Sequence, residues 1–139
     1  MGKATVKESI AAPADELWKL VADFGNTSWM PGGGGSVEVE GSGPGMARII
    51  SAGDRKIREV LESCDGAART LVYTIPEGVP FPVENYRSTM IVTGDDTASE
   101  LEWSCTFEPA GITEAEAQAM IEGMYGTMVG WVRESVTGN

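Results

Sequence analysis

The stretch LEWSCTFEPAGITEAEAQAMIEGMYGTMVGWV, residues 101–132, contains the two patterns that decide the fold. Its first half alternates apolar and polar residues, which predicts a half-buried β-strand. The apolar positions of that strand are Leu101, Trp103, Cys105 and Phe107. Its second half begins with Thr113 and Glu116 in the spacing of a capping box, which predicts a long C-terminal helix of roughly 22 residues.

The predicted C-terminal helix has one apolar arc when its residues are placed at about 100° each. The arc consists of Ala117, Met120, Ile121, Met124, Tyr125, Met128, Val129, Trp131, Val132 and Val136. Gly123, Gly126 and Gly130 lie on the opposite side and lower the helix propensity by about 1 kcal/mol each. We therefore expect packing of the methionine-rich arc, rather than propensity, to stabilise this helix.

The N-terminal quarter predicts a strand followed by a helix. Residues 3–10 read as a short strand, and Pro13 stands where a helix would begin, with acidic residues in its first turn. The apolar stripe of that helix ends at Phe24, and Gly25 stops it. The next segment, NTSWMPGGGG at 26–35, is read as a short helix or a loop.

Residues 36–108 carry only β signals, with alternating stretches separated by turns such as SGPG at 42–45 and Asp65-Gly66. The element order is a strand, a helix, a short helix or loop, six antiparallel strands and a long helix. A meander with one polar face must bury its other face, and the final helix is available to cover it. The sequence predicts a single α+β domain over residues 1–139.

Composition narrows the possible partners. The chain has 139 residues and a net charge of −11, which repels phosphate backbones and anionic membrane surfaces, so we expect no nucleic-acid partner. No apolar run approaches the roughly 18 residues of a membrane span. Cys64 and Cys105 either form a disulfide or, as we expect without a secretory signal, stay reduced in the cytoplasm. With no histidine, we expect neither a metal nor a cofactor.

Four motifs together resemble the START-like, or SRPBCC, superfamily, which has the helix-grip fold. They are AAPADELWKLVADFGN (11–26), VENYRSTMIV (83–92), LEWSCTFEPAG (101–111) and EAQAMIEGMYGTMVGWV (116–132). Within the superfamily the chain is similar to the polyketide cyclase/dehydrase-type branch, which includes lachrymatory factor synthase and plant abscisic acid receptors. The resemblance implies a curved antiparallel seven-stranded sheet wrapped around the C-terminal helix, with two short helices after the first strand. It also implies a largely apolar cavity between sheet and helix.

The resemblance implies a polar pocket at three positions. Arg48 in PGMARII, Glu59 in IREVLE and Tyr86 in ENYRS match residues that line the pocket in this branch. Where the receptors carry a lysine for their ligand's carboxylate, this chain has Trp29-Met30-Pro31, which favours an apolar or aromatic ligand. The loop ISAGDRK, residues 50–56, is shorter than the receptors' gate.

The strand phases support the same three residues independently, because each shares a face with apolar neighbours. The neighbours are Met46 and Ile50 for Arg48, Ile57 and Leu61 for Glu59, and Met90 and Val92 for Tyr86. A buried carboxylate is costly unless it is paired. Glu59 is therefore either the structural partner of Arg48 or a general base or acid in a pocket. In the second case Tyr86 would donate a hydrogen bond to an oxyanion and Arg48 would anchor an oxygen.

A further set of side chains is predicted to contact the ligand or, alternatively, to form ordinary core. The set is Trp29, Met30, Tyr73, Ser88, Met90, Trp103, Met120, Met124 and Met128. The function hypotheses are a cyclase, dehydratase or isomerase, a non-catalytic carrier or sensor of a small apolar or aromatic molecule, and a protein-interaction module with a filled cavity. We expect a monomer or a weak homodimer.

Overall fold

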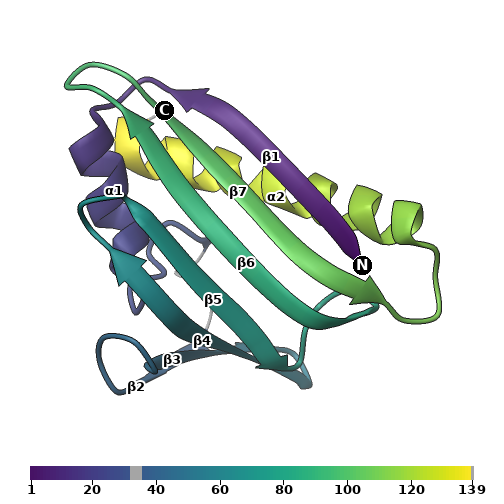
Figure 1. Cartoon of the computed structure of the whole chain (residues 1–139). Coiled ribbons are helices and arrows are strands. Elements are labelled where there is room, and N and C mark those ends of the chain that lie inside the picture. Colours follow the sequence, from purple (N-terminus) through teal and green to yellow (C-terminus); the bar gives the residue numbers. More distant parts are fainter. Residues whose placement is uncertain (32–35, 139) are drawn as a thin grey trace.

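The computed structural model describes residues 1–31 and 36–138, and within them seven strands form one antiparallel sheet in the order β1-β7-β6-β5-β4-β3-β2. Figure 1 shows the sheet with the long C-terminal helix running behind β1 and β7. The strands are β1 (Gly2–Ile10), β2 (Ser36–Glu40), β3 (Ala47–Ala52), β4 (Arg55–Asp65), β5 (Thr70–Glu77), β6 (Val83–Gly94) and β7 (Ser99–Pro109). The helices in the described residues are α1 (Ala14–Ala22) and α2 (Glu114–Thr137). This confirms the predicted seven-stranded helix-grip architecture.

Helix α2 begins as the sequence predicts. The Thr113 side chain accepts a hydrogen bond from the backbone N–H of Glu116 at 3.1 Å, and the Glu116 carboxylate accepts one from the Thr113 N–H at 3.1 Å. These two bonds complete the capping box. Gly138, in the left-handed conformation at φ 79°, ends the helix after 24 residues.

The buried face of α2 is narrower than the predicted apolar arc. Its fully buried residues follow one another at intervals of four and three and lie over β1 and β7. They are Ala117, Ile121, Tyr125, Val129 and Val132. Met120 and Met124 instead remain 48% and 39% exposed. Each precedes a buried residue by one position, and a step of about 100° turns it away from the sheet.

Side chains of α2 also bond to the outer edge of β1. The carboxylate of Glu122 accepts a hydrogen bond from the backbone N–H of Thr5 at 3.1 Å. Arg133 donates to the backbone carbonyl of Ser9 at 3.1 Å and to the carboxylate of Glu8 at 3.0 Å. Helix and edge strand are thus joined by polar contacts as well as by apolar packing.

The expected second short helix falls partly on residues outside the described part of the chain. Residues 24–25 and 28–30 form turns and a bend, Pro31 has 3-10 conformation, and residues 32–35 of the predicted short helix or loop lie outside the described residues. In the turn region before that gap, the Asn26 side-chain oxygen accepts a hydrogen bond from the N–H of Ser28 at 3.0 Å. Such a bond competes with helical pairing. In the described residues α1 is therefore the short helix that follows β1.

Two smaller predictions are settled by the described residues. Neither described helix has the combination of length and apolarity that a membrane crossing requires. Cys64 and Cys105 are free thiols, the first exposed and the second buried.

Substitutions at two glycines test the backbone conformation of the β6–β7 hairpin and of α2. Gly94 in the β6–β7 hairpin has φ 133°, and a Cβ there would lie 2.3 Å from the carbonyl oxygen of Ala98. Gly94→Ala should lower the free energy of unfolding by more than about 1 kcal/mol. Gly123 in α2 has open space around it, so Gly123→Ala should raise that free energy by up to about 1 kcal/mol. Urea unfolding measures both, and changes of the same sign would contradict the described backbone.

Candidate ligand site

An ion pair inside the sheet forms the centre of the candidate site. Arg48 on β3 and Glu59 on β4 are direct cross-strand partners, and Arg48 Nε donates to Glu59 Oε1 at 2.5 Å. The residues are only 4% and 8% exposed. The predicted inward phase of both side chains is what brings them together, because cross-strand partners lie on the same face.

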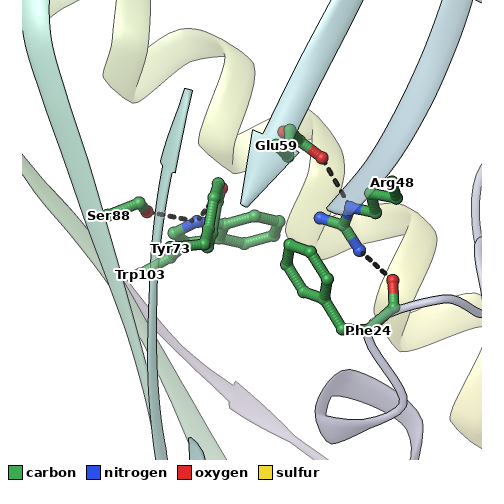
Figure 2. Close-up of polar contacts among 6 residues, drawn as sticks. All are labelled: Phe24, Arg48, Glu59, Tyr73, Ser88 and Trp103. Atoms are coloured by element: carbon green, nitrogen blue, oxygen red, sulfur yellow. Dashed lines mark hydrogen bonds and ion pairs between the residues drawn. The ribbon is translucent and has the colours of Figure 1, made fainter. Parts of the chain in front are cut away.

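The ring of Phe24 covers the Arg48 guanidinium. Its centroid lies 4.1 Å from Arg48 Cζ, and the Tyr73 ring lies 5.7 Å from the same atom. The backbone carbonyl of Phe24 accepts a hydrogen bond from Arg48 Nη1 at 3.0 Å. Figure 2 shows the resulting arrangement, in which Phe24 reaches the ion pair from the chain that follows α1 while Tyr73 approaches from the sheet. Rings of the protein itself occupy the space beside the ion pair.

Irregular strand pairing occurs next to two of the candidate residues. Between the pairs Arg58–Glu77 and Val60–Thr74, β5 has one residue more than β4, so Glu59 lies opposite a bulge. That bulge contains Pro76, which has no N–H to offer the ladder. Such bulges bend a strand and redirect its side chains.

A second register shift lies at Tyr86. Between Glu84 and Arg87, strand β6 has one residue more than β7, and Asn85 takes up the left-handed conformation at φ 52°. The Asn85 side chain donates to the carboxylate of Glu108 at 2.8 Å. The bulge leaves Tyr86 buried at 4% exposure.

The buried hydroxyl groups form a chain of hydrogen bonds in which the donor of each bond can be assigned. Ser88 Oγ donates to the carbonyl oxygen of Ser104 at 3.0 Å, which uses its only proton. Ser88 Oγ must therefore accept from the Tyr125 hydroxyl at 3.1 Å and from Trp103 Nε1 at 3.0 Å. The Tyr125 proton is then also used, so the contact between the Tyr86 and Tyr125 hydroxyls has Tyr86 as its donor. In this arrangement the proton of Tyr86 points at α2 and away from Glu59.

All three tyrosines are neutral at physiological pH. Burial raises the pKa of Tyr73 to about 12, with a further increase from the charge of Glu59 and an opposing effect from Arg48. Burial is also the main cause that raises the pKa of Tyr86 and of Tyr125 well above the usual range. Neutral phenols exchange hydrogen bonds but do not remove protons from a ligand, which leaves Glu59 as the group beside Arg48 that can accept one.

The structure places the three predicted polar residues unequally. Arg48 and Glu59 are in contact, whereas Tyr86 lies on β6, with β5 and its Tyr73 between it and Glu59. The ring centroids of Tyr73 and Tyr86 are 6.4 Å apart. Tyr73, predicted only as a ligand contact, is the tyrosine next to the ion pair.

The remaining residues predicted to contact the ligand lie in three places: an interior polar network, the apolar core and its margin, and a groove on the surface. Ser88, Trp103 and Tyr73 belong to the interior polar network, where Trp103 Nε1 also donates to the Tyr73 hydroxyl at 3.2 Å. Trp29 packs edge-on against Trp103 at 6.1 Å, Met90 is buried, and Met30 and Met128 pack at the margin of the core. Met120 and Met124 line an open groove on the surface with Phe81 and Pro80.

Two residues of the site were not singled out by sequence reasoning. Phe24 counted as the last apolar residue of the first helix, and Tyr125 as one member of the apolar arc of α2. Periodicity correctly indicated that both side chains would be buried. It carried no signal that one ring would stack on Arg48 or that the other hydroxyl would join Ser88.

The ion pair gives a stability prediction. Arg48→Met leaves the Glu59 carboxyl group buried without its partner, and we expect a loss of about 3–5 kcal/mol in the free energy of unfolding. The double variant Arg48→Met/Glu59→Leu should recover most of that loss. The matched control is Arg87 on β6, which pairs with Glu62 on β4. This pair lies on the exposed face of the sheet, opposite to the face that carries Arg48 and Glu59. Arg87→Met should cost only about 0–1 kcal/mol. Equal losses for the two arginine variants in urea unfolding would contradict a buried pair.

The tyrosines give a pH prediction. Their folded pKa values lie above the unfolded value of about 10, so their contribution to stability is fully present below pH about 10. It is lost as the pH rises through the folded pKa values, that of Tyr73 being about 12. Near-ultraviolet absorbance of the folded protein should show no tyrosinate at pH about 10, where the denaturant-unfolded chain is half ionised. A tyrosine that titrates normally in the folded protein would contradict this burial.

Comparisons with known proteins agree with this architecture. The family model described as polyketide cyclase / dehydrase and lipid transport matches residues 1–136. A solved structure from Thermobifida fusca is 29% identical with a TM-score of 0.84, over 98% of this chain and 93% of that one. One from Bacillus thuringiensis is 26% identical with a TM-score of 0.82, over 98% and 99%.

A third structure has the same fold at lower identity. It is norcoclaurine synthase from Thalictrum flavum in complex with dopamine and hydroxybenzaldehyde, 20% identical with a TM-score of 0.72 over 99% of this chain and 87% of that one. No curated protein sequence matched the chain significantly. Since the family model covers nearly every residue, the chain belongs to the polyketide cyclase/dehydrase and lipid transport family, within the START-like superfamily.

Proposed function

We propose that this protein binds a small, largely apolar or aromatic molecule between the sheet and α2, with Arg48 and Glu59 at the polar end of the site. We propose further that Glu59 moves a proton in a cyclisation, dehydration or isomerisation. The observation that carries the proposal is the buried ion pair, which lies against the rings of Phe24 and Tyr73.

The energetic argument starts from the cost of burying two charges. Removing a guanidinium and a carboxylate from water is expensive, and apolar side chains of similar volume often give equal or greater stability. Arg48 and Glu59 are nevertheless in the interior face of the sheet, among aromatic rings. An ion pair in such surroundings is well suited to recognise a polar group on an otherwise apolar ligand.

The roles follow from the contacts. A ligand carbonyl beside Arg48 would have its oxygen stabilised by the guanidinium, while the Glu59 carboxylate takes a proton from the adjacent carbon. The electron pair of the broken C–H bond moves toward that oxygen, giving an enolate. Return of the proton from Glu59 to another carbon isomerises the ligand. Its transfer to a neighbouring hydroxyl group, which leaves as water while the enolate collapses to a C=C bond, dehydrates it. Attack of the enolate carbon on a second carbonyl of the ligand, whose oxygen then takes the proton, cyclises it.

The tyrosines take supporting roles in this proposal. Tyr73 is neutral and next to the ion pair, so it is placed to exchange a hydrogen bond with the ligand. Tyr86, which the resemblance assigns to the pocket, bonds to Tyr125 and would meet a ligand only where the interior opens toward α2. We therefore propose Arg48 and Glu59 as the chemical centre, with Tyr73 closer to it than Tyr86.

The comparisons support the ligand class without naming the ligand. The family description covers cyclases, dehydrases and lipid transport. Norcoclaurine synthase, which has this fold, holds two small aromatic molecules in its solved complex. Both agree with a small apolar or aromatic ligand.

A non-catalytic carrier or sensor is the second candidate. It is favoured by the cover that Phe24 places on Arg48, because a carrier needs only to open and close around its cargo. The exposed side chains of Met120 and Met124 on α2, with the half-buried Phe81 next to them, offer an apolar ligand a first contact on the surface.

The test begins with native mass spectrometry of freshly purified protein, to identify a small molecule that co-purifies. With that molecule, Glu59→Gln should lower turnover by about 100-fold or more while binding is retained, as expected for loss of a general base. Glu62→Gln is the matched control, since Glu62 lies on the same strand but faces outward. Full turnover by Glu59→Gln would contradict the catalytic role. Unchanged binding by Arg48→Lys would contradict the site itself.

A further inference from the structure

We infer that Phe24 occupies the place of the ligand's own aromatic ring, and that the ligand is an aromatic molecule with a hydrogen-bond-accepting oxygen next to the ring. This inference rests on the proposed ligand site at Arg48 and Glu59. It adds the chemical class of the ligand and assigns Phe24 as the residue that competes with it.

The first argument is the geometry around the guanidinium. The Phe24 ring is 4.1 Å from Arg48 Cζ and 5.8 Å from the Tyr73 ring, and Tyr73 is itself 5.7 Å from Arg48 Cζ. Arg48 and Tyr73 therefore flank the volume that the Phe24 ring fills. A guanidinium over a ring face gains a cation–π attraction that a saturated chain does not provide. The place that Phe24 fills is therefore selective for aromatic rings.

The second argument is the backbone of the same residue. The Phe24 carbonyl accepts the Arg48 Nη1–H at 3.0 Å, so Phe24 supplies both a ring and an acceptor oxygen to one guanidinium. When Phe24 moves away, Arg48 loses both contacts while it still donates to Glu59. A buried charged donor without an acceptor is costly. A ligand that restores both contacts must combine an aromatic ring with an oxygen acceptor, as an aryl ketone or aldehyde does.

The third argument is where Phe24 lies in the fold. It follows Asp23, the residue that ends α1, and belongs to no strand of the sheet. Its own N–H bonds to the carbonyl of Ala22, two residues earlier, at 2.9 Å. Displacing Phe24 therefore breaks no pairing between strands. The sheet that carries Arg48 and Glu59 can keep its register while the ring is exchanged.

The experiment uses three probe molecules of similar size. Acetophenone has a ring and a carbonyl, ethylbenzene has the ring alone, and cyclohexyl methyl ketone has the carbonyl alone. Each is titrated by NMR into the intact wild-type protein, Phe24→Ala and Phe107→Ala. Phe107 is equally buried but packs against Gly2 at the far end of the sheet, so it controls for an unspecific cavity.

We expect Phe24→Ala to bind acetophenone about tenfold more tightly than the wild type, since no ring must be displaced. In that variant acetophenone should bind about tenfold more tightly than cyclohexyl methyl ketone, because only an aromatic ring restores the contact with the Arg48 guanidinium. It should also bind more tightly than ethylbenzene, because its oxygen can replace the backbone carbonyl of residue 24, which the variant retains, as acceptor for Arg48 Nη1. The Arg48 Nε–H resonance should shift with acetophenone. Phe107→Ala should show no gain for acetophenone over the wild type.

Several outcomes would overturn the inference. Equal gains for all three probes, or equal gains in Phe24→Ala and Phe107→Ala, would show only an unspecific cavity. A folded Phe24→Ala that binds none of them would also overturn the inference. If Phe24→Ala does not fold, Phe24→Leu, which removes the ring but keeps apolar volume, must show the same order of probes. Acetophenone binding that is insensitive to Phe24 but weakened by Arg48→Lys would overturn this inference and leave the proposed function standing. Insensitivity to changes at Phe24, Arg48 and Glu59 alike would count against both.

Discussion

The position of α2 on the sheet determines which buried groups the helix covers and which need another cover. Its buried row, from Ala117 to Val132, lies over β1 and β7, whereas Arg48 and Glu59 lie at the other end of the sheet on β3 and β4. The long helix therefore cannot shield the ion pair. The chain that follows α1 does so instead, through the ring and carbonyl of Phe24. The inner face of the sheet thus has two unlike covers, the helix α2 over β1 and β7 and a turn segment with a single ring over the ion pair.

In the interior, the charged side chains and the neutral hydroxyl groups lie in separate places. The two charged groups pair with each other on β3 and β4, while the hydroxyls of Ser88, Tyr86 and Tyr125 form a neutral chain on β6 and α2. Tyr73 lies between the two sets, and its pKa rises through burial and through the charge of Glu59. Every buried side-chain nitrogen and oxygen in the described part of the chain has a hydrogen-bond partner. Because these buried polar groups are hydrogen-bonded, their burial costs little folding free energy in a small domain.

Strand alternation predicted the fold well because a period of two assigns a face without reference to distant residues. That is why the inward phases of Arg48, Glu59 and Tyr86 agree with their burial. Alternation could not predict which inward groups meet, since that depends on the bulges near Glu59 and Tyr86 and on the path after α1. The exposure of Met120 and Met124 was missed for a related reason. An apolar arc on a helical wheel is wider than the strip of helix that touches a sheet.

An open sheet has two edge strands with unpaired backbone groups. At the β1 edge, side chains of α2 bond to some of these groups. Glu122 and Arg133 of α2 take up the outward N–H of Thr5 and the outward carbonyl of Ser9, so those groups cannot serve as a template for another chain. On the opposite edge, the short strand β2 carries Glu38 and Glu40. Together with a net charge of −11, these features oppose edge-to-edge aggregation and should help the protein stay dispersed at high concentration.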